Sequence, residues 1–274
     1  MSAVGPTDLR SPAGLAQPVS LRSVALPTEH GGWSLTAEPA VLGLLVAWSW
    51  PGLALAVAAM LAFVARTPLK LVLVDRWRGR WLARSRLGAK VAAVELAILA
   101  VLVTYAAMAA DAGFWLPLAL AAPMVAVELW FDMRSRSRRL IPELAGSIGI
   151  GSIATAVALA GGAPNKVAWG LWVVIAARSI AAIPYVRTQI LRGKSRPPEL
   201  WHSDVAQVLA VAAAGVGWLI DVVPAPAALV IGAVAAMNIV AVRTKPPRVV
   251  VIGVQQMVVG VLVVAVTAIA ILTA

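Results

Sequence analysis

About nine apolar stretches, each near the length that a helix needs to cross a lipid bilayer, occupy most of the chain after residue 32. Only helices and closed barrels satisfy their own backbone hydrogen bonds inside lipid, and continuous apolar runs of this length are typical of helices. The sequence therefore predicts an all-α membrane protein with about nine transmembrane helices. Their predicted bounds are 33–50, 52–74, 90–110, 114–131, 144–160, 167–186, 205–220, 222–242 and 249–273.

The composition supports this class. Of the 274 residues, 61% are hydrophobic and only 13% are charged. A soluble domain has roughly half of its residues apolar and about a quarter charged, so a single water-surrounded core could not bury the excess. The chain has no cysteine, which excludes disulfides, thiolate metal sites and cysteine nucleophiles.

The basic residues set the expected orientation. If the N-terminus is cytoplasmic, then the tail and the loops 66–90, 132–143, 187–204 and 243–248 hold all of the 23 Lys and Arg residues except Lys166 and Arg178. Basic loops stay on the cytoplasmic side of a membrane. We therefore expect a cytoplasmic N-terminus and a C-terminus on the outer side.

Residues 1–27 contain four prolines and no continuous apolar segment, so they are predicted to be a disordered cytoplasmic tail. Residues 28–274 are predicted to be a single polytopic transmembrane domain. In the loop 66–90, Trp77 and Trp81 lie among arginines, which favours a segment resting on lipid headgroups. The net charge of +11 thus indicates membrane lipids as partners rather than nucleic acid, and the oligomeric state stays open.

Polar residues inside the predicted spans lie mainly toward the cytoplasmic side, among them Glu38, Glu128, Arg178 and Asn238. A charge at the centre of a span costs roughly 2.5–3.5 kcal/mol on insertion scales, so this placement predicts a polar cavity that opens to the cytoplasm. Arg178 lies deepest and has no carboxylate three or four residues away, so a group on another helix or a bound anion must neutralise it. The candidate anion-binding or lipid-binding residues are His30, Trp33, Glu38, Arg66, Lys70, Arg178, Tyr185 and Arg187.

A simpler interpretation of the carboxylates near the cytoplasmic ends stays open. Glu128 and Asp132 are four residues apart on one helix face, and Asp132 is four residues from Arg136. These acids, and Glu143, could therefore serve only as partners of nearby arginines.

The chain contains four short motifs: EHGGW at 29–33, ARTPL at 65–69, LIPELAG at 140–146, and ARS at 177–179 together with YVR at 185–187. Together these motifs resemble the YwiC-like family of bacterial membrane proteins. The resemblance implies a multi-pass protein of the bacterial cell (inner) membrane, and it implies no activity.

A more distant similarity is to the UbiA-type prenyltransferases, which share nine spans, an inward N-terminus and basic inner loops after the second and sixth spans. That similarity implies a UbiA-like helical bundle and an isoprenoid diphosphate held through magnesium by two aspartate-rich motifs. This chain has only Asp75 in the first of those loops, and arginines precede Asp204 in the second. A metal-free anion site is therefore favoured, with no cofactor; Asp75, Glu128, Asp132 and Asp204 are the metal or acid–base candidates if magnesium is used.

The leading hypothesis is that the protein binds or handles an anionic amphiphile, such as a phospholipid, an isoprenoid phosphate or a quinone precursor, in an arginine-lined cavity that faces the cytoplasm. One alternative is a divergent prenyl or lipid transferase. Others are an organic-anion transporter and a non-catalytic membrane assembly protein. Whether the protein is an enzyme is left open.

Overall fold

The computed structural model describes residues 21–26, 30–110, 113–134, 139–194 and 199–274, and the side chains of residues 22, 23, 30 and 31 fall outside it. All the secondary structure in these ranges is helical. It consists of one five-residue helix and nine helices of 17 to 29 residues. The helices are α1 Leu21–Ala25, α2 His30–Val46, α3 Trp50–Trp77, α4 Ala83–Ala109, α5 Trp115–Met133, α6 Leu140–Ala160, α7 Asn165–Gly193, α8 Trp201–Leu219, α9 Ala225–Ala241 and α10 Val249–Leu272.

The nine long helices match the nine predicted spans one for one, which confirms the all-α membrane fold. Among the described residues, six of them are long and apolar enough to cross a membrane, and α2 and α9 are apolar but shorter. The α8 helix begins with the polar residues His202, Ser203 and Asp204. The short helix α1 lies within the predicted tail and packs against α3 and α4; most of that tail lies outside the described residues.

Several helices extend beyond their predicted bounds at the basic end, and three of them carry arginines into the extension. The α3 helix continues to Trp77, α4 begins at Ala83, and α7 continues to Gly193. Arginine and lysine are good helix formers, and their long side chains can reach water from a helix end, so an apolar boundary does not end the helix. The predicted headgroup segment is therefore two helix ends joined by a tight turn.

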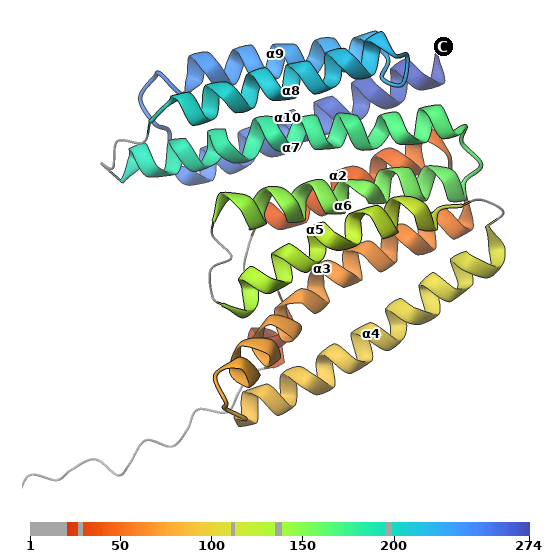
Figure 1. The fold of residues 1–274 in the computed structure, drawn as a ribbon, viewed down its shortest axis with the longest axis vertical. Helices are drawn as coiled ribbons and strands as arrows, with labels where there is room; N and C mark the ends of the chain where they lie inside the picture. The colour runs from red at the N-terminus through yellow and green to blue at the C-terminus, as the bar shows by residue number, and fades with distance from the viewer. Residues whose placement is uncertain (1–20, 27–29, 111–112, 135–138, 195–198) are drawn as a thin grey trace, which may run out of the picture.

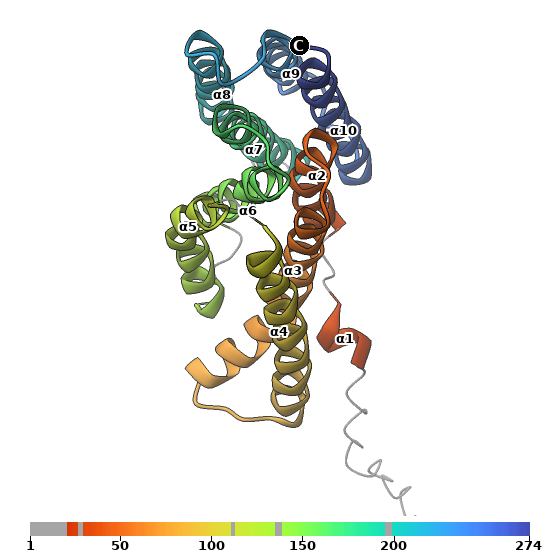
Figure 2. The ribbon, with the colours of Figure 1, turned by 90° about the vertical axis from the view of Figure 1, so that its right-hand side faces the viewer.

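The helices run up and down, so every basic turn falls at one end of the bundle. The α3, α5, α7 and α9 helices all end at the left of Figure 1, where α4, α6, α8 and α10 begin. In Figure 2, α2, α6 and α7 lie in the middle, with α8, α9 and α10 on one side and α3, α4 and α5 on the other. This arrangement is the one that the alternation of basic and non-basic loops predicts.

The core lies around α6 and α7. Small residues let the helices approach closely here, as they do in other membrane proteins. A Cβ on Gly43 of α2 would lie 2.8 Å from the Ala154 carbonyl of α6, so α2 and α6 nearly touch along their backbones. The α4 helix instead pairs only with α3 and α1 among the element pairs with several contacts, and side chains such as Val101 and Met108 on its outer face are exposed.

Candidate functional site

A buried arginine joins three helices in the middle of the bundle. Arg178 of α7 is only 2% exposed. Its Nη2 donates to Oε1 of Glu38 on α2 at 3.3 Å and to the backbone carbonyl of Gln256 on α10 at 2.7 Å. The partner expected from another helix is therefore Glu38. We call Arg178, Glu38 and Gln256 the Arg178 centre.

The surrounding residues are shaped to hold the Glu38 carboxylate. Ser34, one turn earlier on α2, donates its hydroxyl to Glu38 Oε1 at 2.7 Å. On α10, a Cβ at Gly260 would lie 1.9 Å from the same oxygen, so only glycine lets the carboxylate lie against this helix. These contacts explain why a charge pair persists here between apolar helices.

The Arg178 centre has more hydrogen-bonding groups than its own residues use. A guanidinium has five N–H groups, and in the described part of the chain the Nε and Nη1 atoms of Arg178 find no acceptor. Three N–H groups are thus unmatched. Both polar atoms of the Gln256 side-chain amide are also buried without a partner there. An unmatched buried donor or acceptor costs about 1–3 kcal/mol, so this centre is suited to a further polar group.

A line of polar contacts continues along α7 from the Arg178 centre toward the basic end. Tyr185 is buried two turns beyond Arg178, and its hydroxyl donates to Gln255 Oε1 of α10 at 3.4 Å. Gln189 donates to that hydroxyl at 3.4 Å and to the Ala241 carbonyl at 2.9 Å. The contact between α7 and α10 is therefore polar along this line of side chains.

A separate charged cluster links α3 to α5. Arg66 donates through Nε to Asp132 Oδ2 and through Nη2 to Glu128 Oε1, both at 2.9 Å. Lys70 lies 3.1 Å from Asp132 Oδ1, and a Cβ on Gly146 of α6 would lie 2.4 Å from the Glu128 carboxylate. Glu128 and Asp132 are therefore partners of cations on α3, while Arg136 lies outside the described residues.

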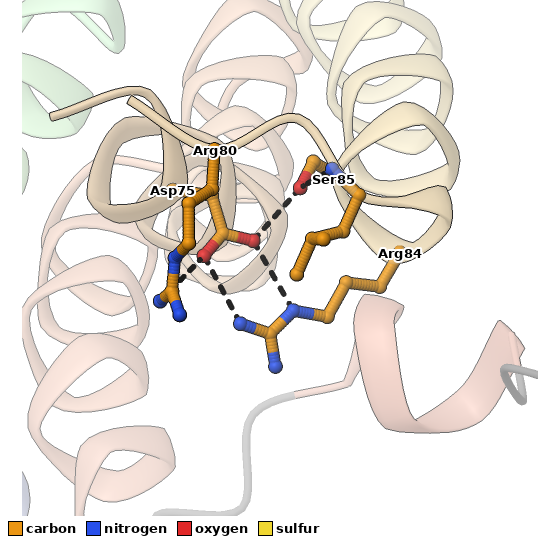
Figure 3. Close-up of polar contacts among 5 residues, drawn as sticks. Asp75, Arg80, Arg84 and Ser85 are labelled. Carbon is orange, nitrogen blue, oxygen red and sulfur yellow. Dashed lines mark hydrogen bonds and ion pairs between the residues drawn. The ribbon is translucent and has the colours of Figure 1, made fainter. Parts of the chain in front are cut away.

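Another buried carboxylate, that of Asp75, organises the turn between α3 and α4. The side chain of Asp75 is 0% exposed and accepts three hydrogen bonds, from Arg84 Nε at 3.1 Å, Arg84 Nη2 at 3.0 Å and the Ser85 hydroxyl at 2.7 Å. The Arg80 Nη2 atom lies 3.5 Å from Asp75 Oδ1. Figure 3 shows these groups converging on the carboxylate from the turn and from the start of α4. We call this the Asp75 cluster.

The remaining predicted site residues lie apart from the Arg178 centre. Asp204 of α8 receives both terminal nitrogens of Arg243, at 3.0 and 2.8 Å, and this carboxylate raises the pKa of the Arg243 guanidinium. Arg187 lies 3.8 Å from Glu143. Trp33 packs edge-on against Phe63. The side chain of His30 lies outside the described residues.

The structure does not bring the four carboxylates of the transferase alternative to one place. Glu128 and Asp132 share Arg66, whereas Asp75 pairs with Arg84 at the start of α4 and Asp204 of α8 pairs with Arg243. Within the described ranges, no group of three or more His, Cys, Asp or Glu residues could hold a metal ion.

Sequence reasoning missed Ser34 and Gly260, and it identified Gln256 as a polar residue inside a span without placing it beside Arg178. The signal for Ser34 was its position four residues before Glu38. The glycine carries no such signal, because its role depends on which helix lies opposite. Nothing in the described residues tests the cavity predicted around Arg178, so the cavity stays a prediction.

The matched family confirms the resemblance drawn from the motifs. The model of a family described as YwiC-like protein matches residues 26–158. Over this stretch, which we call the YwiC-like stretch, the chain is similar to that family. The YwiC-like stretch contains α2 to α5, most of α6 and the first three motifs, whereas the motifs at 177–179 and 185–187 lie beyond it. No curated protein and no solved structure matches the chain. The more distant similarity to UbiA-type enzymes stays a prediction.

The Arg178 centre crosses the boundary of the YwiC-like stretch. Glu38 lies inside it, and Arg178 and Gln256 lie outside it. The ion pair therefore fastens the YwiC-like helices to the helices that follow them.

Proposed function

We propose that this multi-pass membrane protein binds the anionic headgroup of a membrane amphiphile, and that Arg178 makes the decisive contact. The observation that carries the proposal is a guanidinium buried among three helices with three N–H groups unmatched by the described residues. Phosphate and carboxylate oxygens are the acceptors that fit a guanidinium best, because they accept two N–H groups at once.

The surrounding charges support an anionic ligand. Glu38 contacts only the Nη2 side of Arg178, so the Nε and Nη1 atoms remain for a second acceptor. The polar contacts of Tyr185 and Gln189 lead from this centre toward the basic end of the bundle. The ligand class is a phospholipid, an isoprenoid phosphate or the carboxylate of a quinone precursor. We propose the bacterial cell membrane as its location, with the basic end in the cytoplasm.

The first test is the conservative variant Arg178→Lys, studied by native mass spectrometry of the purified protein with its co-purified amphiphiles. Lysine keeps the charge beside Glu38 but lacks the planar fork, so we expect retention of the amphiphile to fall about 10-fold to 100-fold, which corresponds to the roughly 1.5–3 kcal/mol of a charged hydrogen bond. The matched control is Arg243→Lys, which alters another arginine–carboxylate pair away from the Arg178 centre.

The second test is the double variant Glu38→Gln/Arg178→Gln, which removes both charges and leaves no buried carboxylate unpaired. We expect this variant to fold and to lose the amphiphile. Equal retention by the wild type, Arg178→Lys and the double variant would overturn the proposal.

A further inference from the structure

A hollow at the basic end of α3 and α4 lies apart from the Arg178 centre. It has a volume of about 260 Å³ and is lined by Arg76, Gly79, Arg80 and Trp81. Trp81 is 47% exposed, and Trp77, the last residue of α3, is 58% exposed. We call this the turn hollow.

The Asp75 cluster holds the turn hollow in shape. Asp75 fastens the start of α4 to the end of α3 through Arg84 and Ser85, as Figure 3 shows. Its backbone carbonyl also accepts the Arg80 amide at 2.8 Å. Gly79 closes the turn with a φ of +64°, a conformation that glycine adopts without strain. The backbone of the turn that carries the lining residues is therefore held by contacts from both helices.

The charge around the turn hollow is strongly positive. Five arginines lie between positions 76 and 86, and two of them, Arg80 and Arg84, pair with the carboxylate of Asp75. Arg76 has no carboxylate partner among the described residues and lines the hollow. An anion in the hollow would supply the missing negative charge.

The position of the turn hollow favours a lipid headgroup as the anion. It lies where two membrane-crossing helices end, and exposed tryptophans such as Trp77 and Trp81 are typical of the headgroup level of a bilayer. Clusters of arginine directly beside a membrane span attract anionic lipids of the cytoplasmic leaflet. We propose that the turn hollow binds the phosphate headgroup of an anionic phospholipid. This inference does not rest on the proposed function of the Arg178 centre.

The test is a titration of the purified protein in detergent with phosphatidylglycerol or phosphatidylcholine, followed by native mass spectrometry of the retained lipid. The wild type is expected to retain phosphatidylglycerol about 10-fold better than phosphatidylcholine. The variant Arg76→Gln/Arg80→Gln should lose this preference. The control Arg86→Gln/Lys90→Gln removes the same charge outside the hollow's lining and should keep it.

Two further measurements keep the outcome decisive. Arg76→Gln alone disturbs no contact of the Asp75 cluster and should still weaken phosphatidylglycerol retention several-fold. Soluble glycerol phosphate at the same concentration should leave the retained lipid in place. An unchanged lipid preference in both arginine variants would overturn the proposal, and so would complete displacement by glycerol phosphate, which would assign the hollow to a soluble anion.

The same assay separates the two proposals. Glu38→Gln/Arg178→Gln should keep the phosphatidylglycerol preference of the turn hollow, whereas Arg76→Gln/Arg80→Gln should keep the amphiphile at the Arg178 centre. Loss of both ligands in either variant would contradict the independence of the two sites.

Discussion

The Asp75 cluster and the Arg178 centre each contain a buried charged group, but they differ in whether that group has a partner for each of its polar atoms. The carboxylate of Asp75 receives Arg84, Ser85 and a longer contact from Arg80, so both of its oxygens are engaged. The guanidinium of Arg178 has one carboxylate and one carbonyl as partners. One site is saturated, and the other is not.

This difference separates holding helices together from binding a ligand. A buried charge with all its hydrogen bonds made rigidifies the elements that it joins, and nothing further can bind to it without breaking a contact. A buried charge with unmatched donors also joins its helices, but it gains from a further acceptor. We therefore expect substitutions at Asp75 to act through the local stability of the turn that it holds, and substitutions at the Arg178 centre to change stability and to remove a ligand contact directly.

The largest effect is expected from Arg178→Gln alone. This change leaves the carboxylate of Glu38 buried without its cation, and breaking a buried pair in this way costs about 3–5 kcal/mol of unfolding free energy. The double variant Glu38→Gln/Arg178→Gln should recover most of that loss. Unfolding of the purified protein in increasing denaturant measures both, and a double variant no more stable than the single one would contradict the pairing.

An intermediate effect is expected from Gly260→Ala. The added methyl group would lie 1.9 Å from Glu38 Oε1, so α10 or the carboxylate must move, at a cost of about 1–3 kcal/mol. Gly253 on the same helix is the matched control, because a Cβ there meets nothing within 4 Å. Gly253→Ala should be neutral or slightly stabilising, since alanine favours helices. Equal denaturation midpoints for the two variants would show that Glu38 does not pack against α10.

The smallest effect is expected from Asp75→Asn. Asparagine keeps an oxygen for Ser85 but loses the charged contact with Arg84, which costs roughly 1–2 kcal/mol and mainly loosens the turn. Hydrogen exchange should therefore rise at residues 78–82 while α7 stays protected. The control Asp221→Asn changes an exposed carboxylate at a positive φ that asparagine tolerates, and it should leave exchange unaltered. Faster exchange throughout the chain would mean that Asp75 supports more than the turn.

The sequence predicted the helices and their up-and-down order well, because bilayer thickness and the basic loops leave few alternatives. It also singled out Arg178 as a charge that needs a partner on another helix. It could not say that the partner is Glu38, or that Gln256 and Gly260 lie opposite. These helices are apolar on nearly every face, so their sequences do not reveal which side meets which neighbour. The helix ends at Trp77 and Gly193 were missed because the prediction ended each helix where its apolar stretch ends. Arginine and leucine both favour helices, so the helices continue past that point.

The contact between Glu38 and Arg178 also bears on shortened forms of the protein. A truncation after residue 158 would retain the whole YwiC-like stretch but would remove Arg178 and Gly260. Glu38 of α2 would then lie in the bilayer without the guanidinium that pairs with it and without the glycine that makes room for it. Such a fragment would have to protonate Glu38, expel α2 toward water or recruit a cation from elsewhere. Residues 26–158 are therefore expected not to fold as an autonomous unit.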